Sequence, residues 1–321
     1  IDTAKKESID AILEMIQFNK PVVVTGCLAT RYLEDLKKEI PEVNLWIPLE
    51  DYHRFGELFS TLLNGQTLKG MIDPTKREFI SPKRQAYLRI SDGCNNFCTF
   101  CAIPYIRGRF KSIPLDVLKK ELDNFDKDGI RSLTVISQDT SMYGRDIGYS
   151  LVDLVKEIIK HPNFDFVKLM YLYPDEVTDE LIELYNKENI TPYFDLPVQH
   201  FSDKILKHMG RRGSEKDIIN LIAKFRNKVP NAVLRTTIMV GFPSETEEDF
   251  AEVLRQMESI KFDHLGCFMY SPEEGTPGAK FPDQIPQKIK RARYNAVMKL
   301  QKKISYELNK KRIGQEFKCL I

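Results

Sequence analysis

Segments of regular hydrophobic spacing divide most of the chain into a repeating series of predicted strands and helices. Apolar segments with strand character occur at 86–91, 132–138, 166–173, 192–198, 233–240 and 264–270. Segments with helical spacing lie between them, at 114–128, 150–160, 178–188, 202–209 with 215–228, and 245–259. Strands that alternate with helices are typical of parallel sheets. We therefore predict a parallel sheet curled into a partial (β/α)6 TIM-like barrel. A doubly wound open sheet is the alternative, because it gives the same alternation.

The beginning of the chain shows a similar alternation on a smaller scale. Helical patterns and apolar runs follow one another in the order 4–18, 22–25, 31–40 and 45–48. This order predicts a small α/β unit with a parallel sheet over residues 1–72. Residues 73–85 are polar and without periodicity. We interpret them as a linker to a main domain over 86–312.

The end of the chain combines a long helix with a short alternating segment. A helical pattern over 286–311 closes the main domain, and residues 313–321 alternate like a strand that begins a further β domain. The stretch 286–318 holds eleven Lys and Arg residues but two acids, Glu307 and Glu316. This basic character fits contact with RNA or a ribosomal surface, and it also fits a solvated helix face.

Composition places the chain among ordinary globular proteins. Of its 321 residues, 42% are hydrophobic and 29% are charged, and the formal net charge is +2. So small a charge excludes a protein that binds nucleic acid through its overall field. The chain has neither a run of 18 apolar residues nor a secretory signal, so we expect a cytoplasmic protein without a membrane span. Because it starts at Ile1, without Met and inside a helical pattern, we interpret it as part of a longer protein.

The spacing of the cysteines carries the strongest chemical signal. Cys94, Cys98 and Cys101 form a C-x3-C-x2-C motif directly after the first strand of the main domain. In a parallel βα barrel this position lies at the carboxyl ends of the strands, where active sites form. In a cytoplasmic chain, clustered cysteines bind metal or carry out redox chemistry more often than they form structural disulfides.

The number of cysteines narrows the kind of site. A structural zinc site needs four ligands, and a ferredoxin uses four cysteines for each cluster. Three thiolates leave one iron of a [4Fe–4S] cluster open to bind S-adenosylmethionine (SAM) and to pass an electron into its sulfonium. A redox C-x2-C pair is the alternative, but it explains two of the three residues. We therefore predict a cluster on Cys94, Cys98 and Cys101 that cleaves SAM to methionine and a 5′-deoxyadenosyl radical.

The triplet, with Phe100 before its last cysteine, resembles the radical SAM superfamily, and the whole chain is similar to the methylthiotransferase branch of that superfamily. The resemblance implies an N-terminal domain with a second [4Fe–4S] cluster on three cysteines, then a radical SAM domain, then a small TRAM β domain. The segment 24–29 resembles the part that bears the third of those cysteines, here Cys27. The other two would precede Ile1. Residues 314–321 resemble the first strand of TRAM.

Methylthiotransferases of two main branches differ in substrate, which is either an adenosine of tRNA or an aspartate of small-subunit ribosomal protein twelve. Four segments resemble the ribosomal-protein branch, namely SQDTSMYG at 137–144, YLYPD at 171–175, YFDLPVQH at 193–200 and YSPEEGT at 270–276. The tRNA branch typically has Asn-Val-Asn in the first of these segments and Ser-Pro-His-Pro in the second. The small net charge also fits a protein substrate better than a tRNA. We therefore expect the ribosomal protein as partner, with tRNA as the alternative.

The resemblance also implies SAM-binding roles for residues near the ends of the strands. These residues are Phe100, Gln138, Asp139, Gln199, His200, Arg212, Arg235 and Gly241. Arg212 fits a two-pronged contact with the SAM carboxylate, although a loop arginine is also often solvated. His200 fits equally well a structural histidine that caps a helix. Gly241 begins a turn that would line the adenine. Cys267 and Cys319 are expected to be buried as small hydrophobic residues.

These expectations combine into one reaction. One SAM donates a methyl group to sulfur, and a second supplies the radical that abstracts hydrogen from an unactivated C–H bond. A methylthio group then adds at the β-carbon of the aspartate. With at most one of three ligands for the second cluster, this chain is expected to cleave SAM without transferring sulfur. The sulfur donor and the electron donor are not identified, and no membrane partner is expected.

A non-enzymatic alternative is an iron–sulfur electron carrier or a ribosome-binding scaffold. The missing fourth cysteine and the six βα units argue against a simple carrier, because a carrier needs neither an open iron nor a barrel around its cluster.

Overall fold

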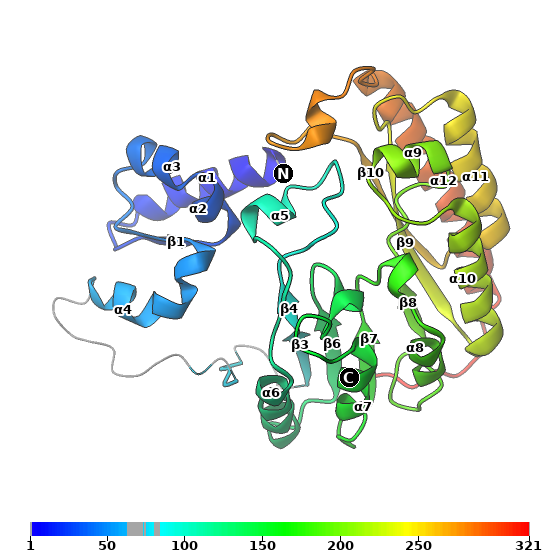
Figure 1. Cartoon of the computed structure of the whole chain (residues 1–321), viewed down its shortest axis with the longest axis horizontal. Coiled ribbons are helices and arrows are strands. Elements are labelled where there is room, and N and C mark those ends of the chain that lie inside the picture. The colour runs from blue at the N-terminus through cyan, green and yellow to red at the C-terminus, as the bar shows by residue number, and fades with distance from the viewer. Residues whose placement is uncertain (1, 63–72, 74, 80–83, 321) are drawn as a thin grey trace.

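A small α/β unit lies beside the carboxyl-end face of a larger barrel-shaped domain (Figure 1). The computed structural model describes residues 2–62, 73, 75–79 and 84–320. The small unit contains α1 (Asp2–Ile16), β1 (Val23–Thr25), α2 (Cys27–Arg31), α3 (Leu33–Glu39), β2 (Leu45–Ile47), η1 (Leu49–Arg54) and α4 (Phe55–Ser60). The parallel pairing of β1 with β2 agrees with the predicted strand–helix–strand order. The predicted linker at 73–85 lies partly outside the described residues, so its role stays a prediction.

The described part of the larger domain contains six parallel strands that follow one another in chain order. They are β3 (Gln85–Arg89), β6 (Ser132–Ile136), β7 (Phe166–Leu169), β8 (Tyr193–Asp195), β9 (Val233–Val240) and β10 (His264–Met269). Ladders join β3 to β6 to β7, and β8 to β9 to β10. A parallel bridge from Val167 to Ile190 links the two halves. A doubly wound sheet would reverse its strand order at a switch point. The order here does not reverse, so the partial barrel is confirmed and the open-sheet alternative is wrong.

Helices follow each strand from β6 to β10 and precede β6, and the longer ones cover the outer face of the sheet (Figure 1). They are α6 (Leu115–Lys127), α7 (Leu151–Ile158), α8 (Asp179–Leu184), α9 (Asp203–His208), α10 (Glu215–Lys228), α11 (Glu247–Ile260) and α12 (Gln287–Lys310). Ser150, Ser214 and Thr246 begin α7, α10 and α11 with capping boxes, in which side chains satisfy the first backbone N–H groups. Among the described helices, none is both long and apolar enough to cross a membrane.

Strand β9 shows how the sheet acquires an apolar face and a polar face. Its residues alternate between buried and half-buried along the whole strand. Leu234, Ile238 and Val240 lie in the core between the sheet and the helices. Because side chains alternate across a strand, Arg235 and Thr237 face the interior of the barrel. The alternation therefore supplies the interior with polar groups while it keeps the outer layer dry.

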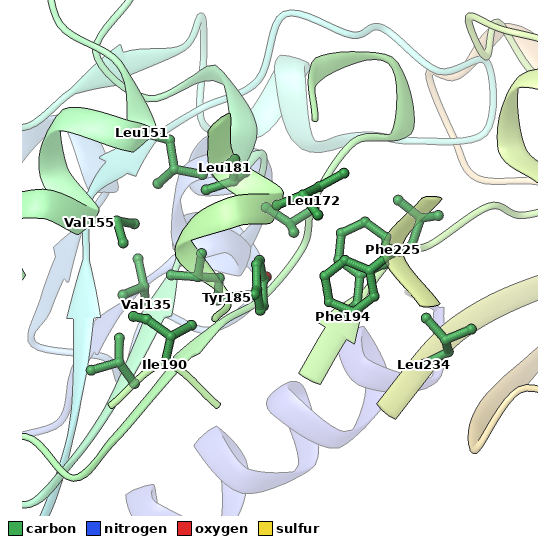
Figure 2. Packing of buried hydrophobic residues seen from close by; sticks show 14 of the residues in the cluster. Val135, Leu151, Val155, Leu172, Leu181, Tyr185, Ile190, Phe194, Phe225 and Leu234 are labelled. Atoms are coloured by element: carbon green, nitrogen blue, oxygen red, sulfur yellow. The ribbon is translucent and has the colours of Figure 1, made fainter. Parts of the chain in front are cut away.

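Aromatic rings fill the core where the two halves of the barrel meet (Figure 2). Phe194 of β8 stacks on Phe225 of α10, with ring centroids 4.1 Å apart and an interplanar angle of 15°. Tyr185 meets Phe225 edge-on at a centroid distance of 4.9 Å. Both phenylalanines are fully buried. This stack packs α10 against β8, next to the position where the ladder is reduced to a single bridge.

The C-terminal segment differs from its prediction. Residues 315–320 form neither helix nor strand, so the alternating segment has no strand partner within the described residues. The Nζ of Lys318 instead lies 2.9 Å from Oδ1 of Asp165, at the start of β7. Cys319 is exposed, and its predicted burial is therefore wrong. A strand needs a neighbour to pair with, and the assignment of this segment to a TRAM domain stays a prediction.

Replacing Phe225 with alanine is expected to lower the free energy of unfolding by about 3–5 kcal/mol, because it removes a buried ring from the stack with Phe194. Urea unfolding followed by circular dichroism measures the change. The control is Phe317→Ala, because Phe317 is 62% exposed, and its expected effect is below about 0.5 kcal/mol. Equal losses in the two variants would contradict this assignment of the core.

Candidate functional site

The loop that carries Cys94, Cys98 and Cys101 is closed at its base by a short hairpin that the sequence did not predict. Strand β4 (Ser91–Asp92) pairs antiparallel with β5 (Lys111–Ser112) directly after β3. Gly93 has a φ of 73°, and a Cβ there would lie 2.2 Å from the Arg109 carbonyl oxygen, so the turn requires glycine. The Cys94 N–H donates to the Gly108 carbonyl at 3.3 Å. The base of the loop is therefore held by backbone contacts.

Thr99 holds the tip of the same loop to the far half of the barrel. Its N–H donates to the Met209 carbonyl at 2.9 Å, and its carbonyl accepts from the Gly278 N–H at 2.7 Å. Its Oγ1 donates to the His208 carbonyl at 2.8 Å. Met209 and His208 lie at the end of α9, and Gly278 lies in η4 (Pro277–Lys280). The loop thus spans the space between the first and second halves of the barrel.

The three thiols of the loop are all at least partly shielded from solvent. Cys94 and Cys98 are 8% and 7% exposed, and Cys101 is half-buried. Burial raises the pKa of Cys94 and raises that of Cys101 to about 11, and negative charge on the neighbouring thiols would raise both further. Without metal, Cys94 and Cys101 therefore hold their protons at neutral pH, and metal binding would release them.

This donor set fits an iron–sulfur cluster better than a single metal ion. Among the described residues, no group of three His, Cys, Asp or Glu side chains is placed to hold one ion. A cubane cluster spreads its thiolate ligands over separate irons, so its cysteines need not converge on one point. Three thiols on one closed loop therefore match the predicted [4Fe–4S] site.

Asn96, which the sequence did not single out, connects the loop to two of the predicted residues. Its Nδ2 donates to Oδ2 of Asp139 at 2.6 Å, and its Oδ1 accepts from Nη2 of Arg212 at 3.1 Å. Asp139 also accepts from the Ser141 hydroxyl at 2.7 Å and is almost fully buried. The one signal in the sequence that could have identified Asn96 is its position between Cys94 and Cys98.

Arg211, and not Arg212, is the arginine that reaches the thiols. Its Nη1 lies 3.9 Å from the Cys98 sulfur, and its guanidinium lies 3.9 Å from the centre of the Tyr173 ring. The Tyr173 hydroxyl is 3.8 Å from the same sulfur. Arg212 instead forms ion pairs with Asp175 at 2.8 Å and Glu176 at 2.9 Å. The sequence favoured Arg212 for a contact with the SAM carboxylate, and that role stays a prediction. Which of the two arginines lies beside the thiols depends on the acids that fold beside them.

Phe100 and Gly241 lie on the apolar side of the loop. The Phe100 ring meets Phe242 edge-on at a centroid distance of 6.5 Å. Gly241 has a φ of 72°, and a Cβ there would lie 2.3 Å from Cγ of Lys290 on α12. The buried carboxylate of Glu245 accepts from the N–H groups of Gly241 and Phe242. Burial raises the pKa of Glu245 to about 7. The turn is therefore fixed by this carboxylate and by helix packing.

Three other predicted residues, Gln138, Gln199 and Arg235, lie along or just beyond the strands. Oε1 of Gln138 is buried and has no hydrogen-bond partner among the described groups. Gln199 has a φ of 74°, and its backbone bonds to Thr237 and Met239 extend the pairing with β9. Arg235 pairs with the buried Asp195 at 2.7 Å inside the barrel. The structure therefore does not bring Arg235 to the cysteine loop.

His200 has the contacts of a structural histidine. It is fully buried, and its Nδ1 accepts from the Ser202 N–H at 2.9 Å, directly before α9. Burial lowers its pKa to about 3, so the ring is neutral. The observation agrees with the alternative that the sequence left open, a histidine that orders the beginning of a helix.

Cys27 lies where the small unit meets the cysteine loop. It follows Gly26 at the beginning of α2, and its thiol contacts the guanidinium of Arg107. Arg107 lies at the end of α5 (Ile103–Ile106), within the loop, and pairs with Asp92 at 2.9 Å. Nearby, Arg31 of α2 pairs with Glu273 at 2.6 Å. These contacts fix the small unit on the same face of the barrel as the three thiols.

The chain is similar in sequence to a known family and to individual proteins within it. The family model for the radical SAM superfamily matches residues 88–257. The ribosomal protein uS12 methylthiotransferase RimO of Alkaliphilus oremlandii (strain OhILAs) is 42% identical over 329 residues, which cover 100% of this chain and 75% of that protein. RimO of Clostridioides difficile (strain 630) is 40% identical over 336 residues, which cover 100% of this chain and 76% of that protein.

Solved structures of other radical SAM enzymes share the fold. The radical SAM methyltransferase TsrM from Kitasatospora setae, with tryptophan and a SAM analog bound, has a TM-score of 0.63 at 13% identity and covers 82% of this chain and 58% of its own. The cobalamin-dependent enzyme OxsB, with aqua-cobalamin and SAM bound, has a TM-score of 0.57 at 14% identity and covers 94% of this chain and 46% of its own. At such identities the likeness concerns the fold alone.

The neutral, buried His200 predicts a loss of stability in acid. Its folded pKa of about 3 lies below the ordinary value of 6.5, so the unfolded chain binds a proton that the folded chain does not. Stability is therefore lost as the pH falls below about 6.5, by roughly 2 kcal/mol between pH 8 and pH 5.

Urea unfolding of the protein and of its His200→Asn variant at several pH values isolates this contribution. The asparagine variant is expected to lose about 2 kcal/mol less than the unchanged protein over this range. His53→Asn is the control, because His53 is exposed on η1, and it should keep the original slope. A slope that His200→Asn leaves unchanged would contradict the assignment of a neutral buried ring.

Proposed function

Because this chain belongs to the radical SAM superfamily and, within it, to the RimO family of ribosomal protein uS12 methylthiotransferases, we propose that it inserts a methylthio group at the β-carbon of an aspartate of uS12. It is a radical SAM methylthiotransferase, and its cofactors are SAM and [4Fe–4S] clusters. The main structural support is the loop that bears three thiols at the carboxyl ends of the strands. A hairpin closes this loop at its base, and hydrogen bonds hold it at its tip. A ribosomal substrate places the reaction in the cytoplasm.

Cys94, Cys98 and Cys101 would hold the radical SAM cluster. When bound, this cluster supplies one electron to the sulfonium of SAM, whose cleavage gives the radical that abstracts hydrogen from an unactivated C–H bond. The protein positions the ligands and keeps water away from them. Hydrogen bonds at both ends of the loop hold the thiols, and the contact of Phe100 with Phe242 forms an apolar wall beside Cys101.

Fixed positive charge beside the thiols supports their ionised form. The guanidinium of Arg211 lies next to the Cys98 sulfur and donates to the Pro197 carbonyl at 2.6 Å, which fixes its direction. A cation so placed stabilises thiolate charge. The ring of Tyr173 under Arg211 adds a cation–π contact. We propose Arg211 as a positioning residue of the cluster site.

Gln138 and Gly241 are the proposed direct contacts to SAM. The buried, unpaired Oε1 of Gln138 is an acceptor at the end of β6 that suits the amino group of SAM. The turn at Gly241, which the Glu245 carboxylate holds in place, is the proposed wall beside the adenine. Arg235 faces the interior and suits polar groups that enter the barrel.

The other predicted residues act through contacts within the protein. Asp139 and Arg212 hold Asn96 from two sides, so they orient the loop between Cys94 and Cys98. Gln199 and His200 order the end of β8 and the beginning of α9, whose last residues hold Thr99. We propose that these four residues position the cofactor site.

Cys27 is the proposed ligand of the second [4Fe–4S] cluster. The position of Cys27 supports this role, because it lies at the beginning of α2 and faces Arg107 of the cysteine loop. A cluster there would lie on the same face as the radical SAM site. This arrangement suits a reaction in which the substrate carbon must meet both a radical and a sulfur atom.

The substrate proposal is tested with the protein in its full natural length, which is also the form used in every transfer measurement below. The readout is mass spectrometry after anaerobic reaction with SAM, sulfide and dithionite. With uS12, the expected product carries one methylthio group on an aspartate residue, and a tRNA transcript offered in parallel stays unmodified. Modification of adenosine in the tRNA, with uS12 unchanged, would reverse the proposal in favour of the tRNA branch. A bound cluster that yields no 5′-deoxyadenosine would instead favour an electron carrier.

The cluster assignment predicts that a cysteine within the loop and a cysteine within a strand differ in their effect on iron content and on SAM cleavage. Cys101→Ala is expected to lower the iron content by about four atoms per chain and to abolish 5′-deoxyadenosine formation. Cys267→Ala is the control, because Cys267 is a buried cysteine that lies within β10 and outside the loop. It should keep both the iron and the activity. An equal loss of iron in the two variants would contradict the assignment.

A third variant separates the roles of the two clusters. Cys27→Ala is expected to keep 5′-deoxyadenosine formation and to lose methylthio transfer to uS12, because Cys27 lies outside the loop of three thiols. Full methylthio transfer by Cys27→Ala would overturn the role of Cys27 and leave that of Cys101 intact.

A further inference from the structure

The outer face of α12 carries a row of exposed cations that the proposed chemistry does not use. Lys288, Arg291, Lys299, Lys302 and Lys310 are exposed, with Tyr306 between the last two. Their separations of three, four or eight residues place them along one side of the helix. We call these six residues the basic stripe. At about 1.5 Å per residue it is about 33 Å long.

The charged side chains on the two sides of α12 differ in whether they have partners within the protein. On the inner side, the Nζ of Lys290 donates to the Tyr270 carbonyl at 2.8 Å, and Arg293 pairs with Glu247 at 2.6 Å. In the described part of the chain, no cation of the basic stripe has an acidic side chain within ion-pair distance. Glu307 points away from the stripe, at the groove that Lys303 shares with Glu258. The outer charges are therefore available to a partner.

A basic helix face of this kind is unusual for this chain. Elsewhere its exposed helical cations often face an acid three residues away, as in Lys37 with Glu34 and Arg255 with Glu252. Lys299 and Lys302 are instead two like charges three residues apart, which is unfavourable in an isolated helix. An ordinary solvated surface does not require this arrangement, whereas a polyanionic partner would offset its repulsion.

A cavity extends the positive surface from the basic stripe toward the barrel. Its volume is about 370 Å³, and its lining includes Lys302, Arg235, His264 and Ser305 but no acidic side chain. Arg235 is paired with Asp195, so Lys302 at this cavity is the cation that remains for an outside anion. The cavity and the stripe together form one positive region on the side of α12 and β10.

We propose that the basic stripe docks on the phosphate backbone of structured RNA, so that this enzyme meets uS12 within an RNA-containing particle. The inference rests on the proposed function, because uS12 is a ribosomal protein and RNA surrounds it in the ribosome. A stripe of about 33 Å matches on the order of one turn of a duplex. The lysines of the stripe suit contacts with RNA phosphates, and the ring of Tyr306 between them suits stacking on an accessible base. The net charge of +2 shows that the attraction is local to this face.

Binding to an RNA hairpin with a stem of about 16 base pairs tests the docking surface. The test variant is Lys299→Gln/Lys302→Gln/Lys310→Gln. The control is Lys127→Gln/Lys187→Gln/Lys216→Gln, which removes the same charge from exposed positions on other faces. The stripe variant is expected to weaken binding at least about tenfold and to reduce the salt slope by about two to three. The control should bind within about twofold of the unchanged protein, and equal melting temperatures exclude misfolding.

Methylthio transfer measured on two forms of the substrate tests the consequence. On purified small ribosomal subunits, the stripe variant is expected to act at least about tenfold more slowly than the control. On a free uS12 peptide the two variants should be equal. Equal RNA binding by the two variants, or no RNA binding by the unchanged protein, overturns the inference. An equal loss on peptide and on subunits also overturns it, because the stripe would then contact protein.

Failure of the proposed function gives a separate result. If the unchanged protein modifies neither form of uS12, the methylthiotransferase proposal fails. The hairpin measurement still decides whether the basic stripe binds RNA.

Discussion

Everything at the site depends on how one long loop satisfies its backbone while crossing the open barrel. At its base, the β4–β5 hairpin and the left-handed Gly93 close the loop. At its tip, Thr99 bonds to the end of α9 and to η4 through its N–H, its carbonyl and its hydroxyl. Because those partners belong to the opposite half of the barrel, the loop both carries the cluster ligands and ties the two halves together. The position of the thiols is therefore coupled to the shape of the whole barrel.

Charges are paired where the barrel must be rigid and unpaired where a partner is proposed. Asp195, with no exposed surface, holds Arg235, and Arg293 lies 3.2 Å from the buried carboxylate of Glu245. Removing one member of such a pair leaves a buried charge uncompensated, so these contacts define orientation more than they add stability. The basic stripe has the opposite character. One helix, α12, therefore closes the barrel on its inner side and presents a surface for an anionic partner on its outer side.

The proposed role of the small unit depends on its position beside the cysteine loop. By itself it is a short parallel sheet with helices and a single cysteine. Its contacts through Arg31 and Glu273, and through Cys27 and Arg107, bring that cysteine to the loop of three thiols. The two proposed cluster sites therefore lie on the same face of the barrel, where a radical chemistry and a sulfur chemistry could act on one substrate.

The sequence by itself determined the alternation of strands and helices, the partial barrel and the three-cysteine loop at the carboxyl ends of the strands. These features follow from local periodicity and spacing, which do not depend on residues far away in the sequence. Tertiary structure decided which arginine lies beside the thiols and which contacts Asn96 and Thr99 make. It also decided that His200 is neutral and that Cys319 is exposed. Each depends on residues tens of positions away, or on the absence of a strand partner. Hydrogen bonds and burial across such distances exist only once the barrel has closed.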